Sequence, residues 1–220
     1  LTRIQSSLPL QQANFLSQQG RCKRLSGERQ EARELFERSL QLRQARKDSA
    51  GVAENLYDLA LLNGDIGHPD DALASYDLAL DHLHRFVGKR NALAAEIQTS
   101  RGRLLRARGE SAASRATYLE ALSIAEEIYG NQHPIALGIR RQLIALQVDQ
   151  EHYVAAEQQI YPLLKLTLAS LGPYHRETAL AWNTRGVIAW ERGHLDQALA
   201  DLARAVEVWR RPDGSQNLAG

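Results

Sequence analysis

Apolar residues recur three and four positions apart over long stretches of the chain that are rich in Ala, Leu, Glu, Gln and Arg. This spacing places apolar side chains on one face of an α-helix. Val, Ile, Tyr and Phe are not gathered into alternating runs between turns, which is the pattern that indicates β-strands. The sequence therefore predicts an all-α protein.

The helical stretches are interrupted at a fixed spacing. Five short turns read LSGERQEA, DIGHPDDA, RARGESAA, DQEHYVAA and WERGHLDQA. One aligned position in these turns holds Gly27, Gly67, Gly109, Glu151 and Gly193. The successive differences between these positions are 40, 42, 42 and 42. A period of this length is typical of a solenoid, in which each unit buries its apolar face against its neighbours.

Each turn joins two predicted helices with small residues at one fixed place. In the first helices this place holds Gly20, Ala60, Gly102 and Gly186, while Ile144 departs from the pattern. In the second helices it holds Ala32, Ala72, Ser114, Ala156 and Ala198, each followed four positions later by a larger residue. We expect the small residues to face each other, so that the two helix axes approach closely.

This pattern resembles the tetratricopeptide repeat family. The last unit matches best, with Trp182, Gly186, Ala198, Leu202 and Ala205 on the family's signature spacing. Arg185 and Arg101 stand where the family usually has an apolar residue. The period of 42, with LG-x-x-H or YG-x-x-HP between units, is similar to the repeats of kinesin light chains and of many bacterial tetratricopeptide regulators.

The resemblance implies a right-handed α-solenoid of five helix hairpins. The hairpins are expected over residues 11–45, 50–87, 92–129, 134–171 and 176–211. A lead-in segment is expected over residues 1–10, and a polar tail or linker over residues 212–220.

The joints between units carry glycine and histidine at the same offset, because Gly172 and His175 follow Gly130 and His133 by 42 positions. We expect each glycine to end a helix at positive φ. Pro134 suits the first turn of the next helix. The histidines are interpreted as capping or packing residues, and a ligand-binding role is the alternative.

The bulk composition excludes several classes of protein. The 220 residues carry a formal net charge of +1, which gives no global bias toward nucleic acid or anionic membranes. No apolar run approaches the roughly 18 residues of a membrane-spanning helix, and no signal peptide opens the chain. The start at Leu1 and the absence of Met suggest a piece of a longer protein. We expect it in the cytoplasm, with the periplasmic part of a membrane-anchored protein as the alternative.

No motif for catalysis or metal binding stands out. His68, His152 and His194 occupy one equivalent place in three turns, and no His-Glu-x-x-His, Gly-x-Ser-x-Gly or phosphate loop is found. Cys22 shares its repeat position with Leu62, Leu104, Leu146 and Ile188, so we expect a buried thiol. The prediction is a protein that is not an enzyme, with no cofactor and no metal.

In the tetratricopeptide family the first helices line a concave groove that takes an extended or helical segment of a partner. Alignment with the family gives as groove candidates Arg21, Arg24, Tyr57, Arg103, Arg106, Arg141, Asn183 and Trp190. Arginine forks suit carboxylates or phosphates, so a basic wall around Tyr57 is one interpretation. The alternative is ordinary solvated arginines. Asp58, Asp65, Asp149 and Glu191 are expected nearby and would neutralise the wall. The family's carboxylate clamp for chaperone C-termini is not reproduced.

The sequence thus predicts a non-catalytic scaffold that binds a protein or peptide, and an acidic segment in that partner is one interpretation. It is expected to act as a regulatory or sensor module of a larger, bacterial protein. The alternative is a switch domain that responds to a signal peptide or small ligand and controls an attached kinase or DNA-binding domain. No direct nucleic-acid contact and no membrane insertion are expected. Homodimerisation through the terminal repeats is considered.

Overall fold

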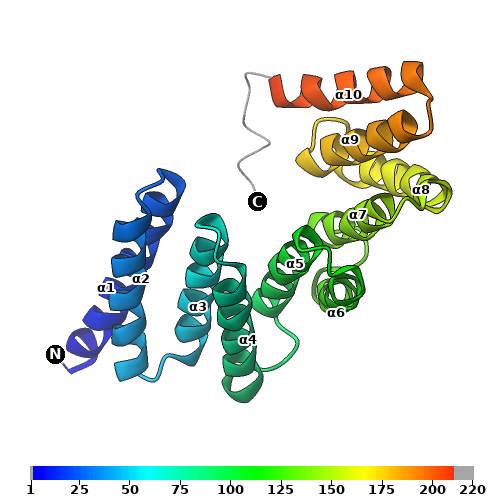
Figure 1. Cartoon of the computed structure of the whole chain (residues 1–220). Coiled ribbons are helices and arrows are strands. Elements are labelled where there is room, and N and C mark those ends of the chain that lie inside the picture. Colours follow the sequence, from blue (N-terminus) through cyan, green and yellow to red (C-terminus); the bar gives the residue numbers. More distant parts are fainter. Residues whose placement is uncertain (1, 211–220) are drawn as a thin grey trace. The chain divides into compact units, whose positions relative to one another are not determined.

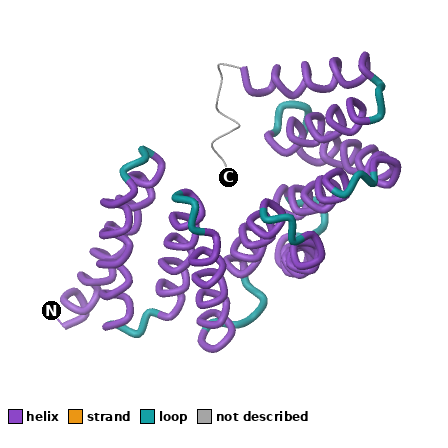
Figure 2. Tube along the Cα trace, in the orientation of Figure 1, coloured by secondary structure: helices purple, strands orange, loops and turns teal. Residues whose placement is uncertain are grey.

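The computed structural model describes residues 2–210, which form α-helices joined by short turns (Figures 1 and 2). No β-strand occurs within this range. The prediction of an all-α solenoid is confirmed. The tail expected over residues 212–220 lies outside the described residues.

The chain divides into two compact units, Leu1–Gly109 and Glu110–Gly220, here called unit 1 and unit 2. Unit 1 contains α1 (Thr2–Leu25), α2 (Arg29–Ala45), α3 (Ser49–Asp65), α4 (Pro69–Phe86) and α5 (Ala92–Ala107). Unit 2 contains α6 (Ser111–Tyr129), α7 (Pro134–Asp149), α8 (Tyr153–Leu171), α9 (Arg176–Glu191) and α10 (Leu195–Arg210). The division falls in the turn between the two helices of the third expected hairpin. Helix α1 begins at Thr2, within the residues 1–10 that were expected as a lead-in segment.

The small residues lie at close helix crossings, as expected. A Cβ atom built on Gly20 of α1 would come within 2.6 Å of the Phe36 ring on α2. A Cβ atom on Gly186 of α9 would come within 2.9 Å of Leu202 on α10. Real Cβ contacts are longer than this, so only glycine fits. In both units the larger residue of the second helix thus packs directly over the glycine. The sequence analysis expected the small residue of the second helix at this place, and only at Gly186 does a small residue, Ala198, come close, through its backbone oxygen at 3.4 Å.

The five aligned turn positions all have a positive φ. Gly27, Gly67, Gly109 and Gly193 have φ values of 83°, 82°, 78° and 76°. Glu151, at the equivalent position before α8, also has a positive φ, of 60°. This region disfavours residues with a Cβ atom and suits glycine. The repeat geometry therefore holds Glu151 in a conformation that its own side chain opposes.

We expect Glu151→Gly to raise the free energy of unfolding by about 0.5–1 kcal/mol, because glycine adopts a positive φ without the Cβ penalty. Chemical denaturation followed by circular dichroism measures the change. Glu151→Ala is the matched control, since it removes the same charge and keeps the Cβ atom. If the glycine and alanine variants were equally stable, the gain in stability would not come from the backbone conformation of residue 151.

The joints between hairpins behave as the sequence predicts. Gly130 and Gly172 end α6 and α8 with φ values of 86° and 83°. The Nδ1 atoms of His133 and His175 then accept hydrogen bonds from the backbone N–H groups of Ile135 and Glu177. These bonds satisfy N–H groups that have no partner within their helices. The two histidines are N-caps, which confirms the structural interpretation.

Cys22 is exposed, so the expectation of a buried thiol is wrong. At the same repeat position, Leu62 is fully buried in a cluster with Ala32 and Phe36 of the preceding helix α2. This position therefore faces the preceding hairpin. Among the described residues, α1 has no preceding hairpin to cover Cys22. The periodicity assigned Cys22 to the correct repeat position, but it could not show that no described hairpin covers this position in α1.

Within residues 2–210, no helix has the length and apolar character needed to cross a membrane.

Candidate partner-binding surface

In unit 1, the first helices α1, α3 and α5 carry a connected set of polar side chains. Arg21 on α1 donates its Nε–H to both carboxylate oxygens of Asp58 on α3, at 2.9 and 3.0 Å. One turn further along, Arg24 donates to Asp65 at 2.6 Å. Two of the predicted groove arginines are therefore paired with acids of the next first helix.

Tyr57 on α3 is fixed from two sides. Its hydroxyl oxygen lies 3.0 Å from the Oγ atom of Ser100 on α5. Its ring packs against the ring of Tyr76 on α4, with a centroid separation of 6.1 Å. Burial raises the pKa of the Tyr57 phenol, and the hydrogen bond with Ser100 only partly opposes this rise. The phenol is therefore a neutral, half-buried group at physiological pH.

Acidic side chains lie among the arginines. Asp58 is almost fully buried, and this burial raises the pKa of its carboxyl, although the hydrogen bond and charge of Arg21 oppose the rise. Burial disfavours the charge on Arg21, but the hydrogen bond from Arg21 to Asp58 and the charges of Asp58, Glu54 and Glu96 raise its pKa overall. In unit 1 the expected basic wall is a surface of mixed charge.

Arg103 on α5 differs from Arg21 and Arg24. Its side chain is exposed, and one of its terminal nitrogens donates to the Ser100 hydroxyl at 2.9 Å. A hydroxyl carries no charge that could neutralise the guanidinium. Arg106, three positions later on the same face, is half-buried and engaged in contacts of its own. We call the set Arg21, Arg24, Tyr57, Asp58, Ser100, Arg103 and Arg106 the first-helix surface of unit 1.

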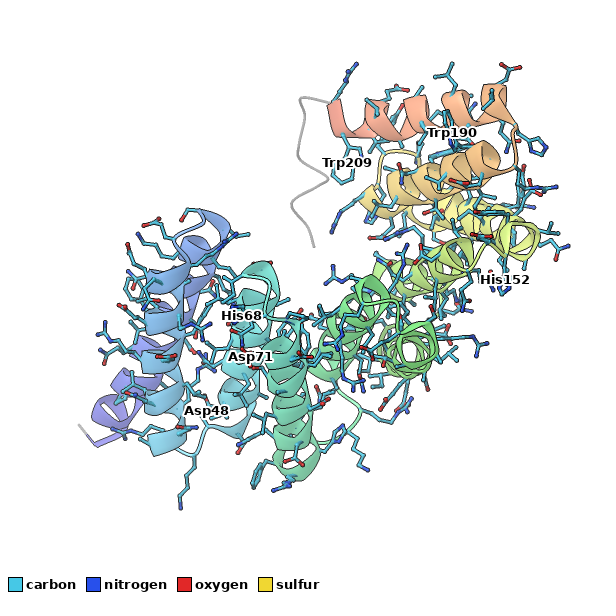
Figure 3. All side chains as sticks on the ribbon, in the orientation of Figure 1. Asp48, His68, Asp71, His152, Trp190 and Trp209 are labelled. Atoms are coloured by element: carbon cyan, nitrogen blue, oxygen red, sulfur yellow. The ribbon has the colours of Figure 1, made fainter. Side chains whose placement is uncertain are left out.

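In unit 2, the predicted residues lie on α7 and α9. Arg141 on α7 faces Glu177 on α9, with 3.5 Å between Nε and Oε2, and both side chains are largely buried. Asn183, Val187 and Trp190 follow at one-turn intervals on α9 and are exposed. Trp190 is labelled in Figure 3. Trp190 is 61% exposed, whereas Trp182 on the same helix is only 9% exposed.

One repeat position makes the same kind of contact in both units. Tyr57, Arg141 and Asn183 share a repeat position, because they are separated by 84 and 42 residues. Tyr57 reaches Ser100 on α5, and Arg141 reaches Glu177 on α9. This position therefore contacts the next first helix. No first helix follows α9 among the described residues, so Asn183 has none to reach and is exposed.

Two family models, both described as "Tetratricopeptide repeat", match this chain over residues 11–83 and 95–135. Together with the repeated hairpins and their glycine crossings, they decide the identification. The chain belongs to the tetratricopeptide repeat family. Such repeats act as scaffolds for interaction with proteins or peptides.

Solved structures of tetratricopeptide type resemble the chain over most of its length. BtubC (BKLC) from P. vanneervenii superposes with a TM-score of 0.75 at 17% identity, covering 94% of this chain and 89% of that one. A candidate kinesin light chain of Podosopora anserina, with nearly identical repeats, gives a TM-score of 0.72 at 14% identity, covering 91% and 96%. At these identities the likeness establishes the fold.

Curated relatives are much longer proteins. A clustered mitochondria protein homolog of Aspergillus niger is 27% identical over 142 residues, which are 64% of this chain and 11% of that protein. A homolog from Aspergillus fumigatus is 26% identical over 149 residues, covering 68% of this chain and 11% of its own length. The chain thus spans about a ninth of the relatives it matches.

Two residues of this chain depart from the tetratricopeptide signature at one position, and the structure shows what each of them contacts. Arg185 stands at an apolar position of the family and donates to both carboxylate oxygens of Asp201 on α10, at 2.6 Å each. Its guanidinium lies 4.4 Å from the centre of the Trp182 ring. Arg101, at the same position in α5, donates to Asp77 on α4 at 3.0 Å. These arginines link helices within their units.

Nothing in the described residues indicates catalytic chemistry. No group of three His, Cys, Asp or Glu side chains within residues 2–210 is arranged to hold a metal ion. His68 belongs to unit 1, and its ring nitrogen lies 3.3 Å from Asp71 at the start of α4 (Figure 3). His152 and His194 belong to unit 2. A shallow, mainly apolar groove between α7 and α8 is lined by Arg140, Leu143, Ile144, Gln158, Gln159, Pro162, Leu163 and Leu166.

Proposed function

We propose that the chain is a docking module that binds an acidic segment of a partner protein on the first-helix surface of unit 1. The observation that supports this most is the environment of Arg103, an exposed guanidinium held by the buried Ser100 hydroxyl beside the half-buried ring of Tyr57. A guanidinium positioned in this way offers two parallel donors to a carboxylate.

The neighbouring residues support a single charged contact in place of a broad basic wall. Arg21 and Arg24 are already paired with Asp58 and Asp65, so a partner would have to compete with these carboxylates. Arg103 donates to the Ser100 hydroxyl, which is uncharged, so an acidic residue of the partner would not compete with a carboxylate there. The proposal therefore assigns the acidic contact to Arg103, with Arg106 on the same helix face and Tyr57 as an apolar neighbour.

The experiment is a selection of peptides from a random displayed library on the wild-type chain, followed by affinity measurement with purified peptides. We expect selected peptides to be enriched in Asp or Glu. The double variant Arg103→Glu and Arg106→Glu should weaken their binding by about tenfold or more, because each substitution replaces an attraction by a repulsion.

The matched control is Arg29→Glu with Arg38→Glu, which places the same change of charge on exposed positions of α2. It should leave the affinity within about twofold, since solvent screens distant surface charges. Equal losses in the two double variants would show a general charge effect and would contradict the proposed contact. Selected peptides without acidic residues would contradict it as well.

The relatives support a role beside other domains, since the matched repeats form a small part of much longer proteins. We extend the proposal to a regulatory module of a larger cytoplasmic protein. Detection of the full-length product in a membrane or periplasmic fraction would contradict that location.

A further inference from the structure

The last two helices present an apolar face that no described part of the chain covers. On α9, Val187 is 36% and Trp190 is 61% exposed. On α10, the exposed fractions are 58% for Leu195, 73% for Leu199, 44% for Val206 and 51% for Trp209. The four residues of α10 are spaced by 4, 7 and 3 positions, so they share one side of the helix. We call these six residues the terminal face; Figure 3 labels its two tryptophans.

The repeat shows what kind of partner fits the terminal face. Forty-two residues earlier, Leu164 and Thr167 of α8 correspond to Val206 and Trp209, and they are only 3% and 1% exposed. Helix α9 packs against both α7 and α8, and Val148, the equivalent of Trp190, packs against the same core. The terminal face is therefore shaped to receive an apolar helical surface.

Within its described residues, helix α1 does not present an apolar face like the terminal face. Helix α1 exposes Gln11, Gln12, Gln18 and Gln19. With an offset of 166 residues, Gln12 and Gln18 correspond to Thr178 and Thr184 of α9, which are buried. The side of α1 that corresponds to the covered side of α9 is thus largely polar, although Phe15 and Cys22 interrupt it. This polarity argues against head-to-tail association of copies through α1.

We propose that the terminal face pairs with the terminal face of a second copy of this chain, with the two α10 helices antiparallel. A face that is complementary to itself favours a closed, two-fold dimer. Charge supports this pairing, because Asp196 lies in the first turn of α10 and Arg210 in the last. In an antiparallel pair, each Asp196 comes opposite the Arg210 of the second copy.

The available area suits a reversible dimer. Six large apolar side chains that are each about half exposed amount to on the order of 600 Å² per copy, so a pair buries about 1,200 Å², the lower limit for specific interfaces. We therefore expect an equilibrium between monomer and dimer in the micromolar range. This dimer is independent of the acidic contact proposed for unit 1.

The test is sedimentation velocity of the whole chain over a concentration series from low to several hundred micromolar. We expect a shift from monomer to dimer, together with a blue shift of tryptophan emission as Trp209 loses contact with water. Leu199→Lys with Val206→Lys should raise the dimer dissociation constant by at least about tenfold, because it places four charges in the paired faces. Ala200→Lys, on the flank of α10, is the matched control and should leave the constant nearly unchanged.

A charge exchange tests the antiparallel arrangement. Asp196→Arg alone and Arg210→Asp alone should each weaken the dimer, and the two together should restore it. Circular dichroism checks that the exposed substitutions leave the fold intact. A monomer at every concentration would overturn the proposal, even if another helix binds the terminal face. A dimer that resists Leu199→Lys with Val206→Lys would overturn it as well.

Discussion

Gly20→Leu is expected to lower the free energy of unfolding by about 3 kcal/mol, because a side chain at this position enters the space of the Phe36 ring. Phe36 is fully buried, and its ring lies only 2.6 Å from the place of a new Cβ atom. The ring cannot turn away without disturbing Leu62, which packs in the same cluster. Denaturant titration monitored by circular dichroism measures the loss.

The matched control is Gly64→Leu, in α3 of the same unit. Gly64 is helical and exposed, and a Cβ atom added there meets nothing within 4 Å. Leucine favours helices over glycine, so this variant should be up to about 1 kcal/mol more stable than the wild type. If the two variants lost similar stability, the close crossing of α1 and α2 would not be the cause. Gly186→Leu should repeat the loss in unit 2, against Leu202.

Arg185→Met is expected to destabilise the protein by about 3–5 kcal/mol, because it leaves the carboxylate of Asp201 buried without its partner. Asp201 is only 1% exposed and accepts two hydrogen bonds of 2.6 Å from Arg185. The variant also removes the guanidinium from the Trp182 ring. Thermal and chemical unfolding of the whole chain would measure the loss.

Two further variants separate the buried charge from a general loss of packing. Adding Asp201→Leu to Arg185→Met should recover part of the stability, because the uncompensated charge is gone. Arg85→Met breaks the exposed pair of Arg85 with Asp81 in α4 and should cost less than about 1 kcal/mol. If the double variant were as unstable as Arg185→Met alone, the buried charge of Asp201 would not be the main cause of the lost stability.

The sequence predicted those parts of the fold that depend on spacing within the repeat. A period of 42 identified Gly20 and Gly186 as crossing residues, and Gly130, His133 and Pro134 as one joint. These features are local or concern two helices of one hairpin, so one pattern determines them. The same logic placed Glu151 among the glycines, and the structure adds that it has their positive φ.

The sequence could not predict features that depend on which neighbour is present. Cys22 has the repeat position of a core residue, yet the preceding hairpin that buries this position elsewhere is absent from the described chain. The alignment places Asp58 and Asp65 near the groove arginines, but it does not assign the pairs. The structure shows that Asp58 pairs with Arg21 and Asp65 with Arg24, over 37 and 41 residues of sequence, because α1 packs on α3.

The most direct test of the proposed function is a double-mutant cycle between Arg103 and an acidic residue of a selected peptide. Calorimetry would give four affinities, for wild type and Arg103→Gln, each with the acidic peptide and with its amide variant. We expect either change alone to weaken binding by about tenfold, and the second change to add little after the first, because both remove one contact. If the two losses simply multiplied, Arg103 would not contact the acid, and the assignment of the docking site to the first-helix surface of unit 1 would be wrong.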